Sequence, residues 1–312
     1  MSKEERIDFL SKDGKTTIHA VKWIPDDGAY RAVLQITHGM VEYIGRYREF
    51  AEYLNSRGFL VVGHDHLGHG ASVRSEKDWG YFAHPDPSDT LVEDMHTLRV
   101  TVQKENPDLP YFMLGHSMGS YMLRKYLCIH PDGIRGAVIM GTGSVPDLTT
   151  RAGLVLCRLL AVFRGWRFRS QLIQSMSYSR PYRKFDLTGE NLKNSWLSKN
   201  EENLKAYYGD PRCTFVFTLN GYRGLLEAVL YDNQKEHIAK MPKELPLLLV
   251  SGEEDPVGDL GEGVKRVYRM FREAGIRDVT CRLYPGDRHE ILNETDRKQV
   301  YADIGKWLGK YV

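Results

Sequence analysis

The sequence predicts an α/β protein with a mostly parallel, doubly wound sheet. Short apolar runs of the buried-strand type, such as FLVVGHD and YFMLG, alternate along the chain with helical patterns of roughly ten to fifteen residues. The 312 residues, of which 42% are apolar and 27% charged, suit a soluble globular protein with one large domain and an insertion, or with two modest domains. Both observations indicate a sheet with helices on both faces.

The N-terminal half opens with strands and then alternates. Residues 7–10, 16–24 and 31–39 have strand composition and are separated by turn sequences, which indicates an antiparallel edge. From Glu42 the apolar residues recur three or four apart, so a helix is expected up to Gly58. Further elements are then expected in order: a strand at 59–65, a helix at 88–105, a strand at 111–115, a helix at 118–129 and a strand at 135–143.

The C-terminal part resumes this alternation after a long interruption. Strands are expected at 245–252 and 279–286, followed by helices at 259–275 and 294–309 respectively. The segment between the strands at 135–143 and 245–252 has a pattern that indicates helices and loops. It is too long for an ordinary connection between neighbouring strands. We therefore expect residues 1–145 and 241–312 to form the core and residues 146–240 to form a helical cap, or lid, over the end of the sheet.

Charge and cysteine content narrow the function classes. A net charge of +2 does not indicate nucleic acid as a partner. The four cysteines are scattered without the spacing of a metal site, which favours free thiols in a reducing compartment. One disulfide is the alternative. The start, MSKEERIDFL, lacks a signal pattern, and no apolar run is long enough to span a membrane. A cytoplasmic protein is expected.

Ser117 is the candidate nucleophile. It lies in GHSMG, between an expected strand and an expected helix, with Gly115 and Gly119 two residues away on either side. A serine on such a tight turn is exposed at the carboxyl edge of a parallel sheet, where ligands bind. The alternative is a serine in a glycine-rich corner with no chemical role.

A serine hydroxyl needs a base and an acid that orients the base, and in this fold the chain order is serine, acid, histidine. The loop after the strand at 245–252 offers Glu253, Glu254 and Asp255. His289, in YPGDRHEIL, is the only histidine beyond them, so it is the expected base, with a surface histidine as the alternative. Asp255 is the favoured acid because Pro256 follows it, and Glu254 is the reserve.

Two backbone N–H groups are expected to stabilise an oxyanion. The first is the N–H of Met118, directly after the nucleophile. The second is the N–H of Met40 in ITHGMVE, after the third strand. His38-Gly39 also reads as the turn that ends this strand, and the two roles are compatible.

Four motifs in this order resemble the monoacylglycerol lipase and lysophospholipase branch of the α/β-hydrolases, which overlaps the serine aminopeptidase-like hydrolases of bacteria. They are THGMVEYIGRYREFAEYLNSRGFLVVGHDHLGHGAS, GHSMGS, SGEEDPVG and RHEILNE. The resemblance covers residues 6–145 and 241–312 and thins out in the cap. It implies the α/β-hydrolase fold, the triad Ser117, Asp255 and His289, and oxyanion donors at Met40 and Met118.

The resemblance also implies substrate-binding residues. Glu42 and Arg46 match the HGxxE…RY pattern and would shape the oxyanion loop and the polar end of the pocket as an i,i+4 ion pair, or else form an exposed helix pair. His38, Gly39 and His116 belong to the same motifs and are included as substrate-binding candidates.

The histidine-rich loop GHDHLGHGAS raises the question of a metal. Its match to the D-x-x-GHG-x-S loop of the family implies a structural turn beside the active site, so no metal site and no cofactor are expected.

The cap is basic between Leu148 and Phe185, with eight Arg and Lys residues and no acidic residue. A basic amphipathic helix with nearby aromatic residues can lie on an anionic lipid surface. It can equally bury its apolar side over the pocket and leave its arginines in solvent. Peripheral contact with an anionic membrane through residues 148–185 is thus one of two expectations.

The expected activity is that of a serine hydrolase acting on lipid-like monoesters, of monoacylglycerol or lysophospholipid type, through an acyl-enzyme. Amide or peptide hydrolysis by the same triad is the alternative. A non-catalytic α/β-hydrolase used as a binding protein is a third interpretation, disfavoured by the complete set Ser117, Asp255 and His289. Epoxide hydrolase and dehalogenase chemistry are disfavoured because those relatives carry Asp at the position that Ser117 occupies here, on the turn between strand and helix.

Overall fold

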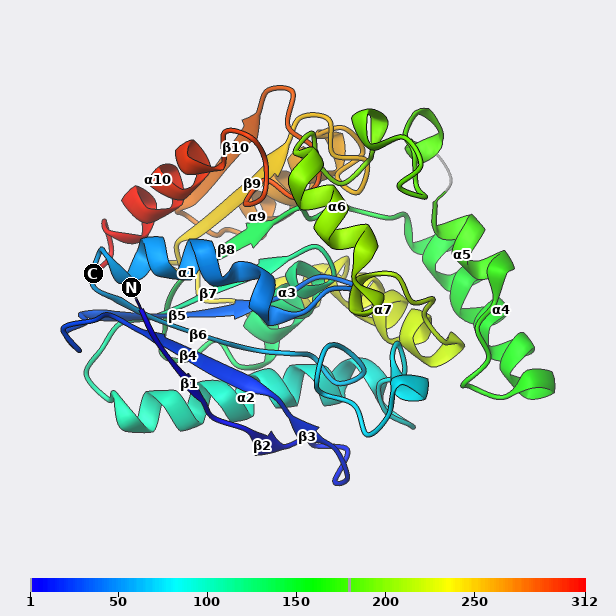
Figure 1. The fold of residues 1–312 in the computed structure, drawn as a ribbon, viewed down its shortest axis with the longest axis horizontal. Coiled ribbons are helices and arrows are strands. Elements are labelled where there is room, and N and C mark those ends of the chain that lie inside the picture. Colours follow the sequence, from blue (N-terminus) through cyan, green and yellow to red (C-terminus); the bar gives the residue numbers. More distant parts are fainter. Residues whose placement is uncertain (1, 179–180) are drawn as a thin grey trace.

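A computed structural model describes residues 2–178 and 181–312 and has the expected α/β architecture (Figure 1). The main sheet has eight strands within these residues, in the order β1-β4-β6-β5-β7-β8-β9-β10. β1 pairs with β4 and β4 with β6 in antiparallel fashion, and the other neighbours are parallel. The antiparallel edge and the parallel centre are both confirmed.

The strands of the main sheet are β1 (Lys3–Arg6), β4 (Ala20–Ile24), β5 (Ala32–Thr37), β6 (Phe59–His64), β7 (Tyr111–His116), β8 (Ile134–Met140), β9 (Leu247–Gly252) and β10 (Val279–Tyr284). β2 (Phe9–Leu10) and β3 (Thr17–Ile18) form a separate small hairpin.

The helices are α1 (Arg48–Asn55), α2 (Pro87–Glu105), α3 (Met118–Ile129), α4 (Asp147–Arg164), α5 (Gln171–Ser177), α6 (Glu201–Gly209), α7 (Leu219–Asp232), α8 (Lys235–Ile238), α9 (Glu262–Glu273) and α10 (Arg297–Leu308). Short 3₁₀ turns lie at Ile44–Tyr47, Glu76–Asp78, Tyr182–Lys184, Leu192–Asn194 and Pro211–Cys213.

Two apolar cores lie on opposite faces of the sheet. Side chains of α1 and α10 pack on one face, and those of α2, α3, α7 and α9 pack on the other. Successive side chains of β7 alternate between them, because neighbours along a strand point to opposite faces: Tyr111 and Met113 join one core, and Phe112 and Leu114 the other. Burial on both faces explains why the central strands are continuous apolar runs.

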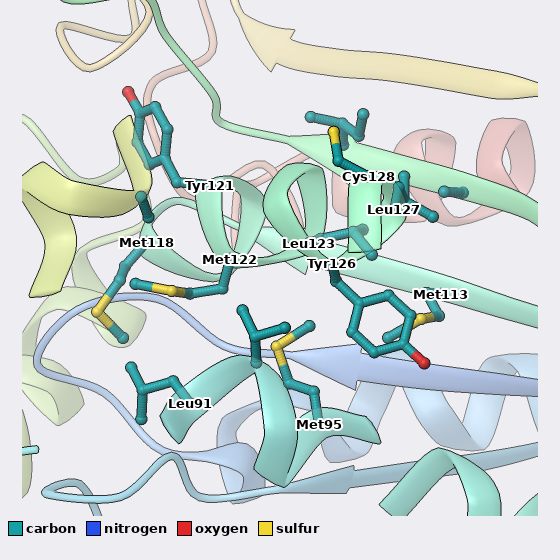
Figure 2. Packing of buried hydrophobic residues seen from close by; sticks show 14 of the residues in the cluster. Leu91, Met95, Met113, Met118, Tyr121, Met122, Leu123, Tyr126, Leu127 and Cys128 are labelled. Carbon is teal, nitrogen blue, oxygen red and sulfur yellow. The ribbon is translucent and has the colours of Figure 1, made fainter. Parts of the chain in front are cut away.

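The helix after the candidate nucleophile is firmly buried. Figure 2 shows Met118 and Met122 of α3 on the side that faces Leu91 and Met95 of α2. Residues from Met118 to Cys128 along α3 are all buried. The start of α3 is therefore held by packing on several sides, which fixes the position of the turn that precedes it.

The expected N-terminal strands are displaced. The first strand is Lys3–Arg6, a charged segment that suits the exposed edge of a sheet, and of the expected strand at 7–10 only Phe9–Leu10 is a strand, in the separate hairpin. The expected strand at 16–24 is broken at His19, whose N–H donates to Ser72 Oγ (2.9 Å) and so leaves the ladder. The helix expected from Glu42 begins as a regular helix only at Arg48, after a 3₁₀ turn.

The segment between β8 and β9 is helical. α4 lies along α7, and α7 packs in turn on α2 and α3, so that α7 connects the outer helices to the core (Figure 1). Within residues 2–178 and 181–312, none of the helices combines the length and the apolarity that crossing a bilayer requires.

Candidate active site

Ser117 occupies a strained turn between β7 and α3. Its backbone lies at φ 52° and ψ −119°, in a region that residues with a side chain rarely adopt. The Ser117 N–H donates to Met140 O (2.9 Å), and this bond ties the turn to the end of the neighbouring strand β8. Its side chain is only partly buried, so the hydroxyl remains accessible at the carboxyl edge of the sheet.

The two glycines around Ser117 are required by close backbone contacts. A Cβ atom on Gly115 would lie 2.4 Å from Gly119 O, and one on Gly119 would lie 2.2 Å from Thr37 O. The turn thus packs directly on the end of β5, and a Cβ on Gly39 would lie 3.0 Å from Ser117 Cβ. The GxSxG spacing reflects this contact between the elbow and the loop after β5.

Asp255 and His289 form a buried pair. Asp255, in the loop after β9, lies with both carboxylate oxygens 3.0 Å from His289 Nδ1. Ser251 Oγ and the Val257 N–H also donate to this carboxylate, at 2.8 and 2.9 Å. Burial opposes its ionisation, but the charge and hydrogen bond of His289, with those two donors, outweigh burial and lower the pKa of Asp255.

The other two acidic candidates point to solvent. Glu253 and Glu254 are exposed, and the Glu254 carboxylate lies 3.8 Å from Arg288 Nε. In the structure His289 therefore contacts Asp255 and not the reserve acid. Since Nδ1 faces the carboxylate, it carries a proton, and Nε2 is the nitrogen left to accept one.

The His289 ring lies close to the elbow. A Cβ on Gly141 would be 3.1 Å from both His289 Cε1 and His116 Cδ2, and Gly141 directly follows Met140, whose carbonyl holds Ser117. The ends of β7, β8, β9 and β10 thus bring Ser117, Asp255 and His289 to one edge of the sheet, although they are far apart in sequence.

The expected oxyanion donors belong to the start of α3 and to the loop after β5. Met118 is the first residue of α3, where unpaired backbone N–H groups and the helix dipole favour negative charge. Met40 lies in the loop after β5, which Val41 closes with a φ of 57°. This loop is held by the Gly39 N–H, which donates to Glu42 Oε1 (2.5 Å).

Glu42 and Arg46 are buried in an ion-pair network and not exposed. Arg46 Nη1 lies 2.9 Å from Glu42 Oε2, and the same guanidinium makes a bidentate contact with Glu290 at 2.6 and 2.7 Å. Asn203 of α6 accepts from Arg46 and donates to Glu290, at 3.0 and 2.8 Å. The network joins the loop after β5, the loop after β10 and the helical segment between β8 and β9.

His116 and His38 both lie within this framework. His116 Nδ1 is 2.9 Å from Glu42 Oε1 and 3.0 Å from Tyr47 Oη, and its ring centroid is 4.7 Å from that of His289. His38 Nδ1 contacts Gly39 O (2.8 Å), and His38 Nε2 accepts from the His66 N–H (2.9 Å). Both histidine rings contact the loops that surround Ser117.

Trp196 and Glu290 are neighbours of His289 that sequence reasoning missed. The Trp196 indole stacks on the His289 ring, with centroids 5.1 Å apart and an interplanar angle of 27°. It comes from the cap, where the motif resemblance thins out, so no signal identified it. Glu290 follows His289 in the quoted RHEILNE motif, and its position next to the base was the available signal.

The loop GHDHLGHGAS forms a buried turn beside the oxyanion loop. The rings of His38, His66 and His69 contact one another with centroids 4.5 to 6.3 Å apart. Asp65 accepts from the N–H groups of Ile44 and Ala71, both at 2.8 Å. In the described part of the chain, no three or more His, Cys, Asp or Glu side chains are arranged to hold a metal ion.

Known proteins resemble this chain along most of its length. Residues 28–296 match the family described as serine aminopeptidase, S33. The chain is 29% identical over 300 residues to the monoacylglycerol lipase of Mycolicibacterium smegmatis, with 96% of this chain and 95% of the relative covered. It is 25% identical to the phospholipase YtpA of Bacillus subtilis, with 90% and 96% covered.

Solved structures show the same fold. A thermostable carboxyl esterase from Bacillus coagulans in complex with glycerol is 29% identical, has a TM-score of 0.89, and covers 99% of this chain and 98% of its own. Because the family match spans most of the chain, the chain belongs to the serine aminopeptidase S33 family of α/β-hydrolases and is a carboxylic ester hydrolase.

Proposed function

We propose that this enzyme hydrolyses lipid-like monoesters, of monoacylglycerol or lysophospholipid type, with Ser117, His289 and Asp255 as its catalytic triad. The observation that carries the proposal is the His289 ring, oriented by both oxygens of the buried Asp255 carboxylate and packed against the residues that hold Ser117. Relatives named as a monoacylglycerol lipase and a phospholipase support the lipid-like substrate class.

The reaction proceeds through an acyl-enzyme. Ser117 Oγ attacks the ester carbonyl carbon while its proton passes to His289 Nε2, and the resulting oxyanion accepts hydrogen bonds from the Met40 and Met118 N–H groups. The C–O bond then breaks, and the alcohol leaves with the proton from His289. Water, deprotonated by His289, attacks the acyl-enzyme and releases the carboxylic acid together with free Ser117.

The residues around this centre serve substrate binding in the proposal. Glu42 and Arg46 hold the oxyanion loop and its polar surroundings, and His38, Gly39 and His116 form the turn and the elbow that the substrate carbonyl approaches. The core comprises residues 1–145 and 241–312, and residues 146–240 form the cap that selects the substrate. No metal or cofactor takes part.

A membrane surface is the proposed second partner. α4 buries Leu154, Cys157 and Ala161 but exposes apolar side chains on another side, and α5 continues this surface. The exposed apolar residues are Leu148, Val155, Leu159, Val162, Phe163, Leu172 and Met176. Apolar side chains flanked by arginines are typical of a helix that lies in the interface of anionic lipid.

The cysteines bear on the compartment in which the enzyme works. All four cysteines lie in the described part of the chain and are free thiols, three of them buried. Free thiols suit a reducing compartment, so we propose that the enzyme works in the cytoplasm.

The triad is tested with single variants. Ser117→Ala should lower kcat by on the order of 10⁶ and abolish labelling by a fluorophosphonate probe. Asp255→Asn should lower kcat by about 10⁴, because the amide would stabilise the wrong His289 tautomer. Glu254→Gln, at the exposed neighbour, is the matched control and should stay within about threefold of the wild type. Activity of Ser117→Ala within tenfold of the wild type would refute the assignment.

The substrate class is tested with a panel of monoacylglycerols, lysophospholipids, p-nitrophenyl esters and aminoacyl amides. Lipid monoesters should give the highest kcat/KM. The family description makes amide hydrolysis the second candidate. Higher kcat/KM on aminoacyl amides than on esters would favour it, and a chain that neither turns over the panel nor reacts with the probe would be a binding protein.

A further inference from the structure

His116, the residue before the proposed nucleophile, meets hydrogen-bond acceptors at both ring nitrogens. Nδ1 faces the Glu42 carboxylate and the Tyr47 hydroxyl oxygen, and Nε2 lies 3.3 Å from His289 O. Tyr47 donates its single proton to Glu42 Oε1 (2.9 Å), so its oxygen can only accept from His116. A carboxylate and a backbone carbonyl likewise only accept.

A neutral imidazole cannot satisfy this arrangement. It has one N–H and one lone pair, and here the lone pair would face an acceptor in a buried site. His116 is only 4% exposed, so water cannot mediate freely. The imidazolium, with two N–H groups, satisfies both contacts. We propose that His116 is an imidazolium in the active enzyme and acts as a positioning residue that holds the backbone of His289.

The network of Glu42, Arg46 and Glu290 beside His116 is neutral only with this cation. Glu42 and Glu290 carry two negative charges, and Arg46 carries one positive charge between them. The three side chains are between 3% and 9% exposed, so solvent compensates little of the remaining negative charge. Buried charges are stable when paired, and a protonated His116 beside Glu42 completes the chain of alternating charges.

The other titratable groups around the ring leave this assignment intact. Burial, followed by the Glu42 charge, raises the pKa of Tyr47, so this group stays neutral. Burial lowers the pKa of His38, which therefore adds no second cation. On the far side of the ring lies His289, paired with Asp255.

The pKa of His116 itself agrees with the geometry. Burial disfavours the charged ring, but the hydrogen bond and charge of Glu42 outweigh burial and raise the pKa above its ordinary value. With a raised pKa, the imidazolium is present at neutral pH and is lost as the pH rises through that value.

Protonation of His116 thus connects its own ring with the oxyanion loop at Gly39 and with the backbone of His289. Glu42 binds both the His116 ring and the Gly39 N–H of the oxyanion loop, and His116 donates to the carbonyl of the base. Loss of the proton places a lone pair of His116 against His289 O and loosens the loop after β10 that carries His289. The kinetic part of the inference rests on the proposed function, since it assumes that His289 is the base.

The protonation state is measured directly by NMR of ¹⁵N-histidine-labelled full-length protein, with the His116 signals assigned by their loss in His116→Gln. Both ring nitrogens should carry protons at pH 7.5. Glu42→Gln should shift the His116 titration down by about 1–3 pH units, because the carboxylate charge is removed. Glu93→Gln, at the partly exposed His130 pair, is the control and should leave it unchanged. A single protonated nitrogen at pH 7.5 would overturn the inference.

The positioning role is measured by the pH dependence of kcat on a p-nitrophenyl ester between pH 7 and 10, with Ser117→Ala as the blank. The wild type should lose activity on the alkaline side with a single titration. His116→Gln cannot titrate there, so its kcat should be about tenfold lower at pH 7.5 and flat above it. An alkaline limb that persists in His116→Gln would refute this role. Because the NMR result does not depend on turnover, failure of Ser117 as nucleophile would be seen separately.

Discussion

Ser117 shows how a single backbone conformation depends on its neighbours. Its positive φ is unfavourable by roughly 1–3 kcal/mol, and such strain persists only where the surroundings impose it. Here the Ser117 N–H is held by Met140 O, and the turn is pressed against β5 through Gly119. The strain therefore follows from the packing of three strands, and glycine at position 119 is the residue that permits this packing.

Gly119→Ala should disrupt this contact. The new Cβ would lie 2.2 Å from Thr37 O and 2.5 Å from His38 O, both backbone atoms that cannot move aside cheaply. We expect the free energy of unfolding to fall by about 2–4 kcal/mol and kcat to fall by at least about 100-fold, because the loop after β5 must shift relative to Ser117. Urea unfolding and kcat on a p-nitrophenyl ester measure the two effects.

Gly209→Ala is the matched control. Gly209 is the last residue of α6, and a Cβ there meets no atom within 4 Å. Alanine should leave activity unchanged and raise the free energy of unfolding by up to about 1 kcal/mol. Equal effects of the two substitutions would contradict the packing argument.

At the scale of elements, the loop that carries His289 and the segment at residues 193–197 form one unit. Arg288, next to His289, donates to Ser195 O (2.6 Å) and Lys193 O (3.2 Å) of the cap. The Glu290 N–H donates to Leu197 O (2.8 Å), and Trp196 stacks on the base between these contacts. The cap segment is thereby fixed relative to the histidine.

Arg288→Met should loosen this segment while keeping most of the side-chain volume. The carbonyls of Lys193 and of the buried Ser195 would lose their donor, which should destabilise the protein by about 1–3 kcal/mol. We expect kcat/KM to fall by about 10–100-fold as Trp196 and His289 lose alignment, and limited proteolysis to cut near residues 193–198. Arg297→Met, at the surface pair with Glu49, should change neither quantity. Unchanged proteolysis in Arg288→Met would count against the coupling.

The exposed apolar side of α4 makes a second prediction at this scale. Replacing Val162 and Phe163, which are 78% and 82% exposed, with Ser should weaken binding to phosphatidylglycerol-containing vesicles by at least about tenfold. Leu10→Ser is the control, because Leu10 is 61% exposed but lies in β2, away from α4 (Figure 1). Binding that is indifferent to anionic lipid and to salt would contradict the proposed docking.

Elements with a strong local signal were predictable from the sequence, and elements fixed by distant contacts were not. β7 and α3 were placed correctly because a buried strand, two glycines and a helical repeat occur in one short stretch. β1 was missed because its charged residues pair with β4 through backbone bonds that leave no apolar pattern. Trp196 was missed because its partner, His289, is distant in sequence and no local pattern marks the contact.

At the scale of the whole molecule, buried histidines and buried carboxyl groups have opposite effects on how stability depends on pH. Burial lowers the pKa of His38, His66 and His69, and lowers that of His64 to about 3. Burial also raises the pKa of Asp232 to about 8, against the opposing effect of Arg124. Unfolding below neutral pH lets the histidines take up protons and lets such carboxyls release them, so the two groups partly cancel in the pH dependence of stability.

His64→Met should isolate the contribution of one buried histidine to the pH dependence of the unfolding free energy. Folded His64 takes up a proton only near pH 3, whereas the unfolded chain does so near pH 6.5, so its contribution to stability is present above pH 6.5 and declines as the pH falls below it. Between pH 7.5 and pH 5, the unfolding free energy of the wild type should therefore decrease by about 2 kcal/mol relative to that of His64→Met.

Urea unfolding at the two pH values measures this difference. Val62→Met, in the same strand, removes no titratable group and should show the same difference from the wild type at both values. A His64→Met difference that does not change with pH would show that His64 is not neutral and buried as described.

The two ends of the helical insertion meet. Asn233, just after α7, donates to Val145 O (2.8 Å) and to Asp147 Oδ1 (2.9 Å), and Gln234 donates to Asp147 Oδ2 (3.0 Å). The segment between β8 and β9 thus begins and ends at the same place, where these hydrogen bonds join its two ends. The entropy of closing such a loop depends only weakly on its length. Recombination could exchange the whole segment as a cassette, provided that it keeps a helix like α7 on the core. Under the proposed role of residues 146–240 in substrate selection, such an exchange would change the substrate range while the sheet stays the same, and grafting the corresponding segment of a relative between β8 and β9 would test it.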